Sequence, residues 1–574
     1  MPPATMRLSR FLLPGLFVLL PALLTAQAPA EVVPAPATSL PLKHAPQPTA
    51  AAITAADLMT RLYIFADDSM MGREAGTLGN LKGTDYIAAE VKRMGLLPAG
   101  DNGGYFQTLP YKTRAVARSS VVAIGAANLS YGSEWVVSLG TPPKGTFPIA
   151  FGGTLGDGSP RIDAAQAAGK LVVYRVLPSG MALIRDSSAF PAGAAAFGFV
   201  GLDPFMAGFA QPITFVDDKK PQPTTRLPIL TFAQSTLAKM FDADVATLTA
   251  GTDGHAATLN VTITTEPVAF PARNVVAILP GSDARLKGEY VAVGAHNDHI
   301  GFNHRPVDHD SIRIYNHIAR PAGAEDGGKQ ANAAQQTEIN TQLAAWRSAH
   351  PNSARADSIS NGADDDGSGS VTVLEIAEHL ASLPTKPKRS MLFVWHVGEE
   401  KGLLGSAFFT DHPTVSRDSI VAQLNIDMVG RGDAWDVTGQ SKDGGALHGG
   451  ANYLQLIGSR RLSTELGDLA ESVNRDGAFG FTFDYAMDAN GHPQNIYCRS
   501  DHYTYARYGI PIVFFTTGGH SDYHQVTDEP QYIDYPHMAR VGNLIASIAM
   551  HAADLDHRIV VDKPKPDPAG SCRQ

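Results

Sequence analysis

The sequence predicts an α/β protein with a mixed, largely parallel sheet covered by helices on both faces, and a mostly β segment inserted before it. Apolar runs of strand length alternate with helical patterns after Arg273, which is typical of largely parallel sheets. The run 391–395 is continuously apolar, as expected for a strand buried on both faces. Between residues 116 and 271, short apolar runs separated by glycine and proline turns indicate strands with few helices.

The elements expected in the second half are five strands, 274–279, 290–295, 391–395, 421–426 and 512–515, and two helices, about 370–383 and 537–555. Two helices are expected earlier, one starting at Ala55 and one ending at Gly95. In the β-rich part the clearest strands are 121–124, 171–174 and 227–230. Since strands and helices alternate only after Arg273, we expect the sheet to be built mainly there.

Length and composition exclude some classes of protein. A chain of 574 residues has room for two or three domains. Its formal net charge of -10 gives no sign of the basic face that nucleic-acid binding requires. Cys498 and Cys572 are the only cysteines, so a disulfide framework is not expected to stabilise the fold. Cys572 falls in a tail that we expect to be disordered.

The first 28 residues have the features of a secretory signal. Arg7 and Arg10 precede an apolar segment, 11–24, and small residues follow it. Because this segment is interrupted by two prolines and is shorter than the roughly 20 residues needed to span a membrane, we expect cleavage after Ala26 or Ala28. The mature protein would then be exported, periplasmic or secreted, without a stable membrane anchor.

The chain divides into six predicted segments by composition and pattern. These are a signal peptide (1–28), an Ala/Pro linker (29–52), amino-terminal helices that belong with the large α/β domain (53–113), a β-rich domain (114–270), that α/β domain (271–557) with an insertion (300–360), and a tail (558–574). The insertion is mostly polar and long for a loop in a compact domain. We expect it to lie over the carboxyl edge of the sheet, with one helix near 335–346.

Acidic and histidine side chains recur where predicted strands end. Two adjacent glutamates follow the strand 391–395, and an Asp-rich turn precedes the helix at Ser370. In open α/β sheets ligands bind at the carboxyl ends of the strands. Two histidines and three carboxylates there make a plausible pair of zinc sites with one shared ligand; the candidates are His296, Asp365, Glu400, Asp427 and His524.

Each of these residues has another interpretation when it is taken alone. A histidine at a strand end is often a hydrogen-bonded structural residue, and the turn at 364–366 could be a plain turn or a calcium loop. Asp427 could simply cap a helix. The HExxH motif of thermolysin-type enzymes is absent. It is the recurrence of such residues at the same kind of position that favours a metal centre.

Six motifs carry a resemblance to a known family. The chain from about 273 to 555 resembles the co-catalytic di-zinc aminopeptidase and glutamate carboxypeptidase family, family twenty-eight of the metallopeptidases, which implies a zinc exopeptidase fold. Residues 55–112, which include GREAGT, resemble the amino-terminal helices of such exported enzymes, and about 120–268 resembles a protease-associated domain. The motifs are GAHND (294–298), NGADDDGSG (361–369), GEEKGLLGS (398–406), NIDMVG (425–430), RSDHYTY (499–505) and SDYH (521–524).

The resemblance implies a role for each matched residue and two zinc ions as cofactors. One zinc would be held by His296 and Asp427, the other by Glu400 and His524, and Asp365 would bridge both. Glu399 would be the general base, Asp298 would hold His296 in one tautomer, and Tyr523 would lie near the reacting carbonyl. Relatives also often have a cis peptide bond after the bridging aspartate, here between Asp365 and Asp366.

The function that the resemblance implies is hydrolysis of amino-terminal residues from a peptide substrate. A carboxypeptidase or dipeptidase acting on acidic peptides is an alternative; it would need an arginine cluster, for which Arg499 and Arg507 are candidates. A glutaminyl cyclase-like transferase would use a single zinc. A catalytically silent binding ectodomain would have lost ligands or the base. The oligomeric state is not predicted.

Two features depart from the family pattern. About 70 residues separate His296 from Asp365, and the extra segment contains four histidines: His304, His309, His317 and His350. Because both of its flanks carry predicted ligands, this insertion is expected to form a lid or rim over the metal cleft. His299 directly follows Asp298; it could support the site from behind the ligands or lie on the surface, and we favour the surface.

Overall fold

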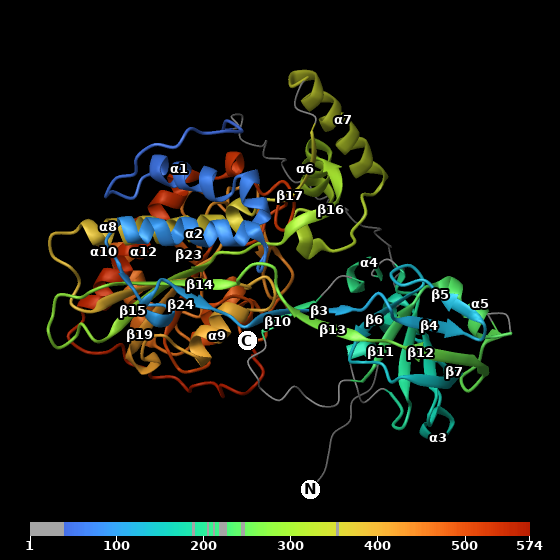
Figure 1. The fold of residues 1–574 in the computed structure, drawn as a ribbon. Coiled ribbons are helices and arrows are strands. Elements are labelled where there is room, and N and C mark those ends of the chain that lie inside the picture. The colour runs from blue at the N-terminus through green and yellow to red at the C-terminus, as the bar shows by residue number, and fades with distance from the viewer. Residues whose placement is uncertain are drawn as a thin grey trace, which may run out of the picture.

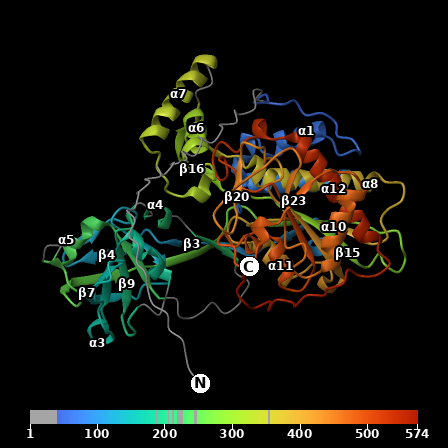
Figure 2. The same ribbon diagram turned by 180° about the vertical axis from the view of Figure 1, so that it is seen from behind.

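The computed structural model describes residues 40–185, 190–203, 206–210, 213–216, 227–242, 247–351 and 355–574. The predicted signal peptide, residues 1–28, lies outside the described residues. Figures 1 and 2 show a larger body of sheet and helices, a β-rich part beside it, and a helical projection above. No helix among the described residues is both long and apolar enough to cross a membrane.

A nine-stranded mixed sheet forms the centre of the larger body. Its order is β1-β14-β18-β15-β19-β24-β22-β23, and β2 also pairs with β14. Neighbours from β18 to β24 are parallel, whereas β14 and β22 run antiparallel to their neighbours β18 and β24. The strands are β1 (Leu97–Pro98), β2 (Phe106–Thr108), β14 (Arg273–Leu279), β15 (Tyr290–His296), β18 (Ser390–His396), β19 (Ile420–Ile426), β22 (Tyr453–Ile457), β23 (Thr482–Asp484) and β24 (Ile512–Thr516).

Helices cover both faces of this sheet, which confirms the predicted fold class. In β18, Met391, Phe393 and Trp395 belong to one core, while Leu392 and Val394 belong to the other. The first core contains the apolar faces of α1 (Ala55–Phe65), α2 (Leu78–Arg93), α8 (Gly369–Ser382), α10 (Thr464–Asp476) and α12 (Tyr535–Asp554). The second contains α9 (Leu404–Asp411) and α11 (His502–Ala506). A strand buried in this way must be apolar along its whole length, as β18 is.

The β-rich part is an eight-stranded mixed sheet, in the order β5-β4-β12-β7-β8-β9-β11-β6. It has two cores of its own, built by buried side chains from these strands. The strands are β4 (Val121–Ile124), β5 (Ala127–Leu129), β6 (Trp135–Leu139), β7 (Gly145–Leu155), β8 (Leu171–Val176), β9 (Ala196–Val200), β11 (Ile229–Phe232) and β12 (Asp253–Asn260), with short helices α3 (Ala164–Ala167), α4 (Met206–Phe209) and α5 (Leu237–Met240).

A small sheet, β10-β3-β13, lies between the two parts (Figure 1). Its strands are β3 (Tyr111–Val116), β10 (Ile213–Val216) and β13 (Ile263–Pro267). Tyr111 is buried in a cluster with Ala75, Ala272 and Val397 of the larger body, and its hydroxyl donates to Thr214 at 2.6 Å. The chain therefore enters and leaves the β-rich part through paired strands.

The insertion is a hairpin that carries two helices. It consists of β16 (Gly301–Asp308), α6 (His309–Ala319), α7 (Ala333–Ala349) and β17 (Ala356–Ser360), and β16 pairs antiparallel with β17. The helix expected near 335–346 is α7. A second small hairpin, β20 (Val437–Gln440) and β21 (Ala446–His448), follows β19.

Two sequence-based expectations about the ends of the chain are wrong. The tail is not disordered: Cys572 forms a disulfide with Cys498, and Gln574 hydrogen-bonds to the backbone of Met487 and Ala489. The described residues of the expected linker also pack on the body, where the hydroxyl of Tyr63 in α1 donates to the Pro41 carbonyl and Lys43 pairs with Asp67. These contacts use backbone groups and single side chains, so hydrophobic periodicity cannot predict them.

Candidate metal centre

The predicted ligands come together because parallel strands end at one edge of the sheet. His296 is the last residue of β15, Asp427 follows β19, and Glu399 and Glu400 follow β18. His524 lies in the loop after β24, and Asp365 in the irregular turn 363–368 before α8. In register, Ala295 pairs with Trp395 and Ile426 pairs with Phe515. The five side chains converge from five separate segments.

Two groups of potential ligands meet at this edge. In the first, Nε2 of His296 lies 3.1 Å from Oδ1 of Asp365 and 3.6 Å from Oδ1 of Asp427. In the second, Nε2 of His524 lies 2.9 Å from Oδ2 of Asp365 and 3.0 Å from Oε2 of Glu400. The two oxygens of Asp365 therefore face different groups, which is the arrangement a shared ligand requires.

The turn that carries Asp365 is held by backbone hydrogen bonds. The amides of Asp364 and Asp365 donate to the carboxylate of Asp528, and the peptide bond between Asp365 and Asp366 is cis. Gly362 has a φ of +55°, and a Cβ there would lie 2.2 Å from the Asp365 carbonyl oxygen and 2.5 Å from the His299 ring. Only glycine fits this position without moving the turn.

The donor set fits divalent zinc. The inward nitrogens of His296 and His524 and one oxygen of Glu400 are buried without a hydrogen-bond partner. Burial alone would lower the pKa of His524, but the carboxylates of Asp365 and Glu400 raise it to about 10. A buried cluster of carboxylates thus demands positive charge, and imidazole with carboxylate is a donor set that zinc takes. These residues could hold two ions with Asp365 between them.

Asp298 supports the site differently from the expectation. The Nδ1–H of His296 donates to the backbone carbonyl of Asp298 at 3.1 Å, whereas the Asp298 carboxylate lies 3.8 Å from that nitrogen. The carboxylate instead accepts from the amides of Gly398 at 2.7 Å and Glu399 at 3.2 Å. Asp298 therefore fixes the His296 tautomer through its backbone and the glutamate turn through its side chain.

Glu399 and Glu400 face different surroundings although they are adjacent in sequence. Glu399 lines the pocket beside the ligands together with Asp365, Asp427 and Tyr523, while Glu400 is turned into the second group. Burial is the main cause that raises the pKa of Glu399 well above its ordinary value; the charge of His296 opposes it and that of Asp427 adds to it. Glu399 is thus a carboxyl group with a raised pKa that faces the pocket.

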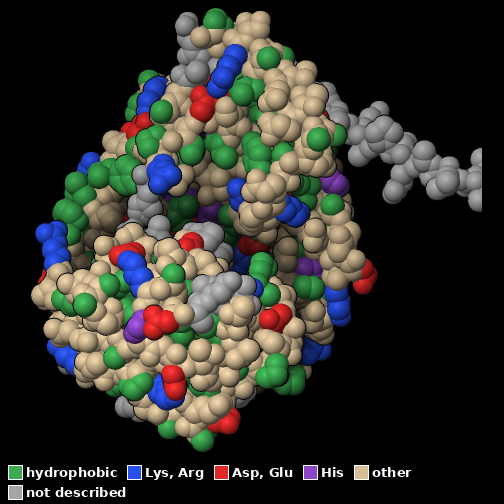
Figure 3. All heavy atoms as spheres, turned by 90° about the vertical axis from the view of Figure 1, so that its right-hand side faces the viewer, with side chains coloured by type: hydrophobic (Ala, Val, Ile, Leu, Met, Phe, Trp, Pro, Cys, Tyr) green, Lys and Arg blue, Asp and Glu red, His purple; other side chains and the backbone are tan. Residues whose placement is uncertain are grey.

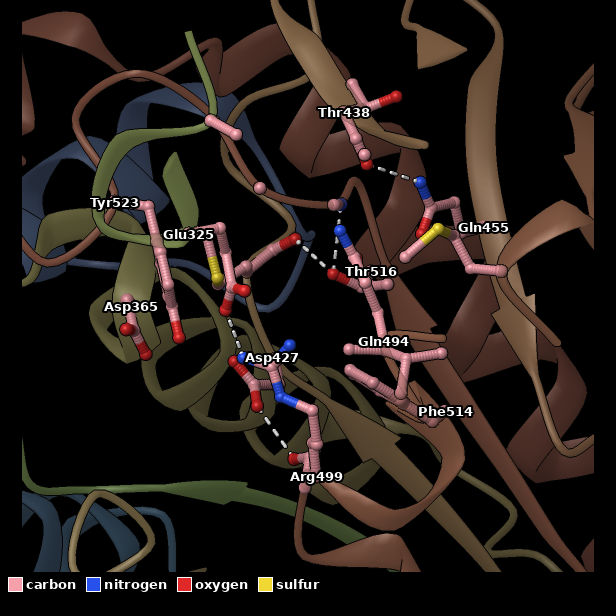
Figure 4. Close-up of a pocket in the computed structure, with 18 of the residues that line it drawn as sticks. Glu325, Asp365, Asp427, Thr438, Gln455, Gln494, Arg499, Phe514, Thr516 and Tyr523 are labelled. Atoms are coloured by element: carbon pink, nitrogen blue, oxygen red, sulfur yellow. Dashed lines mark hydrogen bonds and ion pairs between the residues drawn. The ribbon is translucent and has the colours of Figure 1, made fainter. Parts of the chain in front are cut away.

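The pocket beside the ligands is lined by both acidic and apolar side chains. Figure 4 shows Asp365, Asp427 and Tyr523 on one side and Gln455, Gln494 and Phe514 on the other. Met428, Met487 and Ile496 add apolar surface. Figure 3 views the molecule from the β-rich side and shows its surface hollowed between that part and the insertion. The pocket could accept one amino-acid side chain next to the ligand groups.

The insertion contacts the loop that carries His524. The amide of Ala324 donates to the Tyr523 carbonyl at 3.2 Å, and a Cβ on Gly323 would lie 2.7 Å from the His520 carbonyl oxygen. Glu325 pairs with Arg499, and both line the pocket (Figure 4). The insertion therefore supplies part of the pocket wall.

A third acidic cluster joins the insertion to the body and is already neutralised. Nδ1 of His309 lies 3.1 Å from Asp357, and Glu529 is close by. The guanidinium of Arg355 contacts all three side chains, at 2.9 Å from His309 and 3.5 Å from Asp357. Since Arg355 supplies the compensating positive charge, we interpret this cluster as an ion-pair contact that holds the insertion against the body.

Two residues differ from their expected positions. His299 is not on the surface: its side chain is fully buried, with Nδ1 2.7 Å from Oε1 of Glu400. The signal was its place next to a strand end that carries ligands, where the chain runs through the interior. Arg499 lines the pocket, but Arg507 pairs with Asp411 and contacts α9 instead. The two arginines do not form a cluster.

A family profile matches the second half of the chain, and curated relatives match parts of it. The profile described as peptidase family M28 matches residues 274–549. Leucine aminopeptidase 1 of Coccidioides posadasii is 30% identical over 203 residues, 33% of this chain and 47% of that protein. Leupeptin-inactivating enzyme 1 of Streptomyces exfoliatus is 35% identical over 96 residues, 15% of this chain and 22% of that protein. The chain thus spans about half the length, or less, of these curated relatives.

Solved structures resemble the whole chain more loosely. An aminopeptidase from Aneurinibacillus sp. strain AM-1 has a TM-score of 0.48 at 17% identity, over 90% of this chain and 97% of that one. A zinc aminopeptidase from Bacillus subtilis has a TM-score of 0.46 at 16% identity, over 88% of this chain and 96% of that one.

Proposed function

We propose that this protein, whose residues 274–549 match the profile of peptidase family M28, is an exported zinc exopeptidase that removes amino-terminal residues from peptides. The observation that carries the proposal is the pair of ligand groups sharing Asp365 beside a pocket lined by Glu399. An amino-acid-sized pocket next to two such groups suits hydrolysis at the end of a peptide better than cleavage within a long chain.

Two zinc ions are the proposed cofactors, one held by His296 and Asp427, the other by Glu400 and His524, with Asp365 between them. Zinc ions bound in this way polarise a carbonyl and lower the pKa of a bound water. Glu399, at the pocket wall, accepts a proton from the attacking water and delivers it to the leaving amine. The Tyr523 hydroxyl is placed to donate a hydrogen bond to the developing oxyanion.

The lining of the pocket suits a peptide with a free amino terminus. Asp365, Glu399 and Asp427 line it, and a carboxylate oxygen that is not bound to a metal ion can accept a hydrogen bond from the α-ammonium group. Arg499 is the arginine among the lining residues, and Glu325 neutralises it. That arginine is the one observation in favour of the alternative, a carboxypeptidase or dipeptidase on acidic peptides. The complete ligand set and the base weigh against a single-zinc transferase and a silent ectodomain.

Export is proposed on two features. The first 28 residues have the pattern of a secretory signal, with Arg7 and Arg10 before an apolar segment. The pairing of Cys498 with Cys572 suits an oxidising compartment, because disulfides are rare in the cytosol. Expression with the native amino terminus, followed by fractionation and determination of the mature amino-terminal residue, tests this part. Retention in the cytosol with residues 1–28 intact would contradict it.

A substrate panel tests the proposed activity. Leucyl-p-nitroanilide and other aminoacyl-p-nitroanilides should be hydrolysed, whereas their N-acetylated forms should be inert because the α-ammonium group is lost. Dipeptides with a carboxyl-terminal glutamate serve as the comparison. If N-acetylated substrates and free-amine substrates are cleaved equally, or if only the glutamate dipeptides are cleaved, the aminopeptidase assignment is wrong.

A further inference from the structure

His299 lies among the second group of ligands. Its side chain is fully buried. Its Nδ1 is 2.7 Å from Oε1 of Glu400 and 3.8 Å from Oδ2 of Asp365, and its ring lies 5.5 Å, centre to centre, from the ring of His524. The four side chains each place one ligand atom within 4.8 Å of all the others. His299 therefore faces the same point in space as the predicted ligands.

Although Nδ1 of His299 lies 2.7 Å from Oε1 of Glu400, neither ring nitrogen makes a hydrogen bond of acceptable geometry. Buried imidazoles are normally hydrogen-bonded through at least one nitrogen, and leaving such a group unpaired costs about 1–3 kcal/mol. The backbone of His299 is fixed by its amide, which donates to the Arg73 carbonyl at 3.2 Å, and the ring is confined by Gly362. The ring is held in place while its nitrogens remain free to bind a ligand.

We infer that His299 is a further zinc ligand, completing a four-residue site with Asp365, Glu400 and His524. The inference rests on the proposed two-zinc function. It adds that the two zinc sites have different numbers of protein ligands. The first group supplies only three side chains, and two of them, Asp365 and Asp427, line the pocket. Apart from the shared Asp365, the four-residue group does not line it.

This asymmetry assigns different roles to the two sites. Structural zinc sites carry four protein ligands, whereas catalytic sites keep a position open for water or substrate. The site with His299 is therefore the tighter one, which holds the turn of Asp365 and the loop of His524 in place. The site of His296 and Asp427 is the more exchangeable one, and it faces the substrate pocket.

Chelator competition on the purified protein tests this inference. The wild type should bind two zinc ions with separable affinities. His299→Ala should weaken the tighter one by more than about 100-fold, the upper end of what losing a hydrogen-bonding partner of a ligand costs. His299→Asn, whose amide is polar and able to donate a hydrogen bond to Glu400, should not restore it. The control is His537→Ala, a buried histidine outside both groups that bonds to the Tyr453 carbonyl; its affinities should match the wild type.

X-ray absorption of the fully loaded wild type provides a second readout that needs no variant. Three histidines shared by two ions give about 1.5 imidazoles per zinc, whereas the set without His299 gives about 1.0. A count of about 1.0, or zinc affinity in His299→Asn within about 10-fold of the wild type, overturns the inference. If the wild type binds two ions and that result is obtained, the proposed function stands; if it binds none, the proposed function itself fails.

Discussion

Asp365, Glu399 and Glu400 are the single residues on which the proposed chemistry depends most. Their positions could be predicted because each lies beyond a strand or before a helix that the apolar pattern defines. His299 could not be placed correctly, because three residues beyond the end of β15 the apolar pattern no longer distinguishes interior from surface. The role of the Asp298 carboxylate depends on which backbone amides approach it, and only the folded loop decides that.

The paired glutamates give a prediction of separable effects. Glu399→Gln should retain both zinc ions, and its kcat should fall by about 10²–10⁴-fold, the usual contribution of a general base. KM should change little, because the lost interaction belongs to the transition state. Glu400→Gln should lose zinc affinity and stability, since zinc binding is coupled to folding. Steady-state kinetics and zinc analysis on the same preparations measure this. Near wild-type turnover in Glu399→Gln would refute its role as the base.

The insertion is the element that sequence patterns describe least well. Its helix α7 buries one apolar side chain, Ile339, so periodicity indicates a helix without indicating what it packs on. The contacts that matter come from the segment between α6 and α7, where Ala324 and Glu325 meet the loop of Tyr523 and the pocket wall. These contacts join residues about 200 positions apart by sequence numbering. No local signal can predict them.

Glu325→Ala tests whether the insertion shapes substrate binding. Removal of this carboxylate takes a negative charge from the pocket and leaves Arg499 unpaired there, so peptides with a free α-ammonium group should bind less well. We expect KM to rise by about 5- to 10-fold, equivalent to about 1 to 1.4 kcal/mol and thus to one ordinary hydrogen bond, with zinc content unchanged. Glu338→Ala, on the exposed face of α7, is the matched control. Equal KM values for the two variants would show that the insertion does not form the rim.

The short helix α11 gives a prediction about acid stability. His502 is buried and donates to the Tyr497 carbonyl at 2.7 Å; burial lowers its pKa to about 3. Because the unfolded chain binds this proton near pH 6.5 and the folded chain does not, the folded state should lose about 2 kcal/mol between pH 7.5 and pH 5 through this residue. The loss begins as the pH falls below about 6.5.

Urea unfolding of wild type and His502→Phe at both pH values measures this effect at constant zinc concentration. The variant should be less stable at pH 7.5, because the Tyr497 carbonyl loses its donor. The stability difference between the two proteins should then shrink by about 2 kcal/mol at pH 5, because only the wild type carries the titrating group. A difference that does not change with pH would mean that His502 is not held neutral.

The whole molecule has the α/β class that the apolar pattern predicts, because burial of the sheet on both faces imposes that pattern on every central strand. The behaviour of the two ends could not be predicted in this way. The tail is tied down by Cys572 and Gln574, and the segment 40–52 by single contacts with α1 and α8, such as Thr49 with Glu378. Such contacts are few and polar, so they produce no hydrophobic periodicity in the sequence.

The disulfide between Cys498 and Cys572 gives a prediction about the stability of the whole molecule. It closes a loop with a sequence separation of 74 residues, and the chain-entropy model assigns such a loop about 4 kcal/mol of stability. Cys572→Ser should therefore lower the thermal midpoint of unfolding. Differential scanning calorimetry with and without reductant measures the shift. An unchanged midpoint in the variant would contradict a stabilising role for the tail.

Zinc stoichiometry directly tests whether the protein has two ion sites that share the carboxylate of Asp365. Elemental analysis after zinc reconstitution and removal of excess metal should give about two ions per chain for the wild type and about one for Asp427→Ala. Asp365→Ala should fall below the Asp427→Ala value, because Asp365 belongs to both ligand groups. If the wild type binds one ion or none, or if Asp365→Ala keeps two, the protein does not have two ion sites that share Asp365.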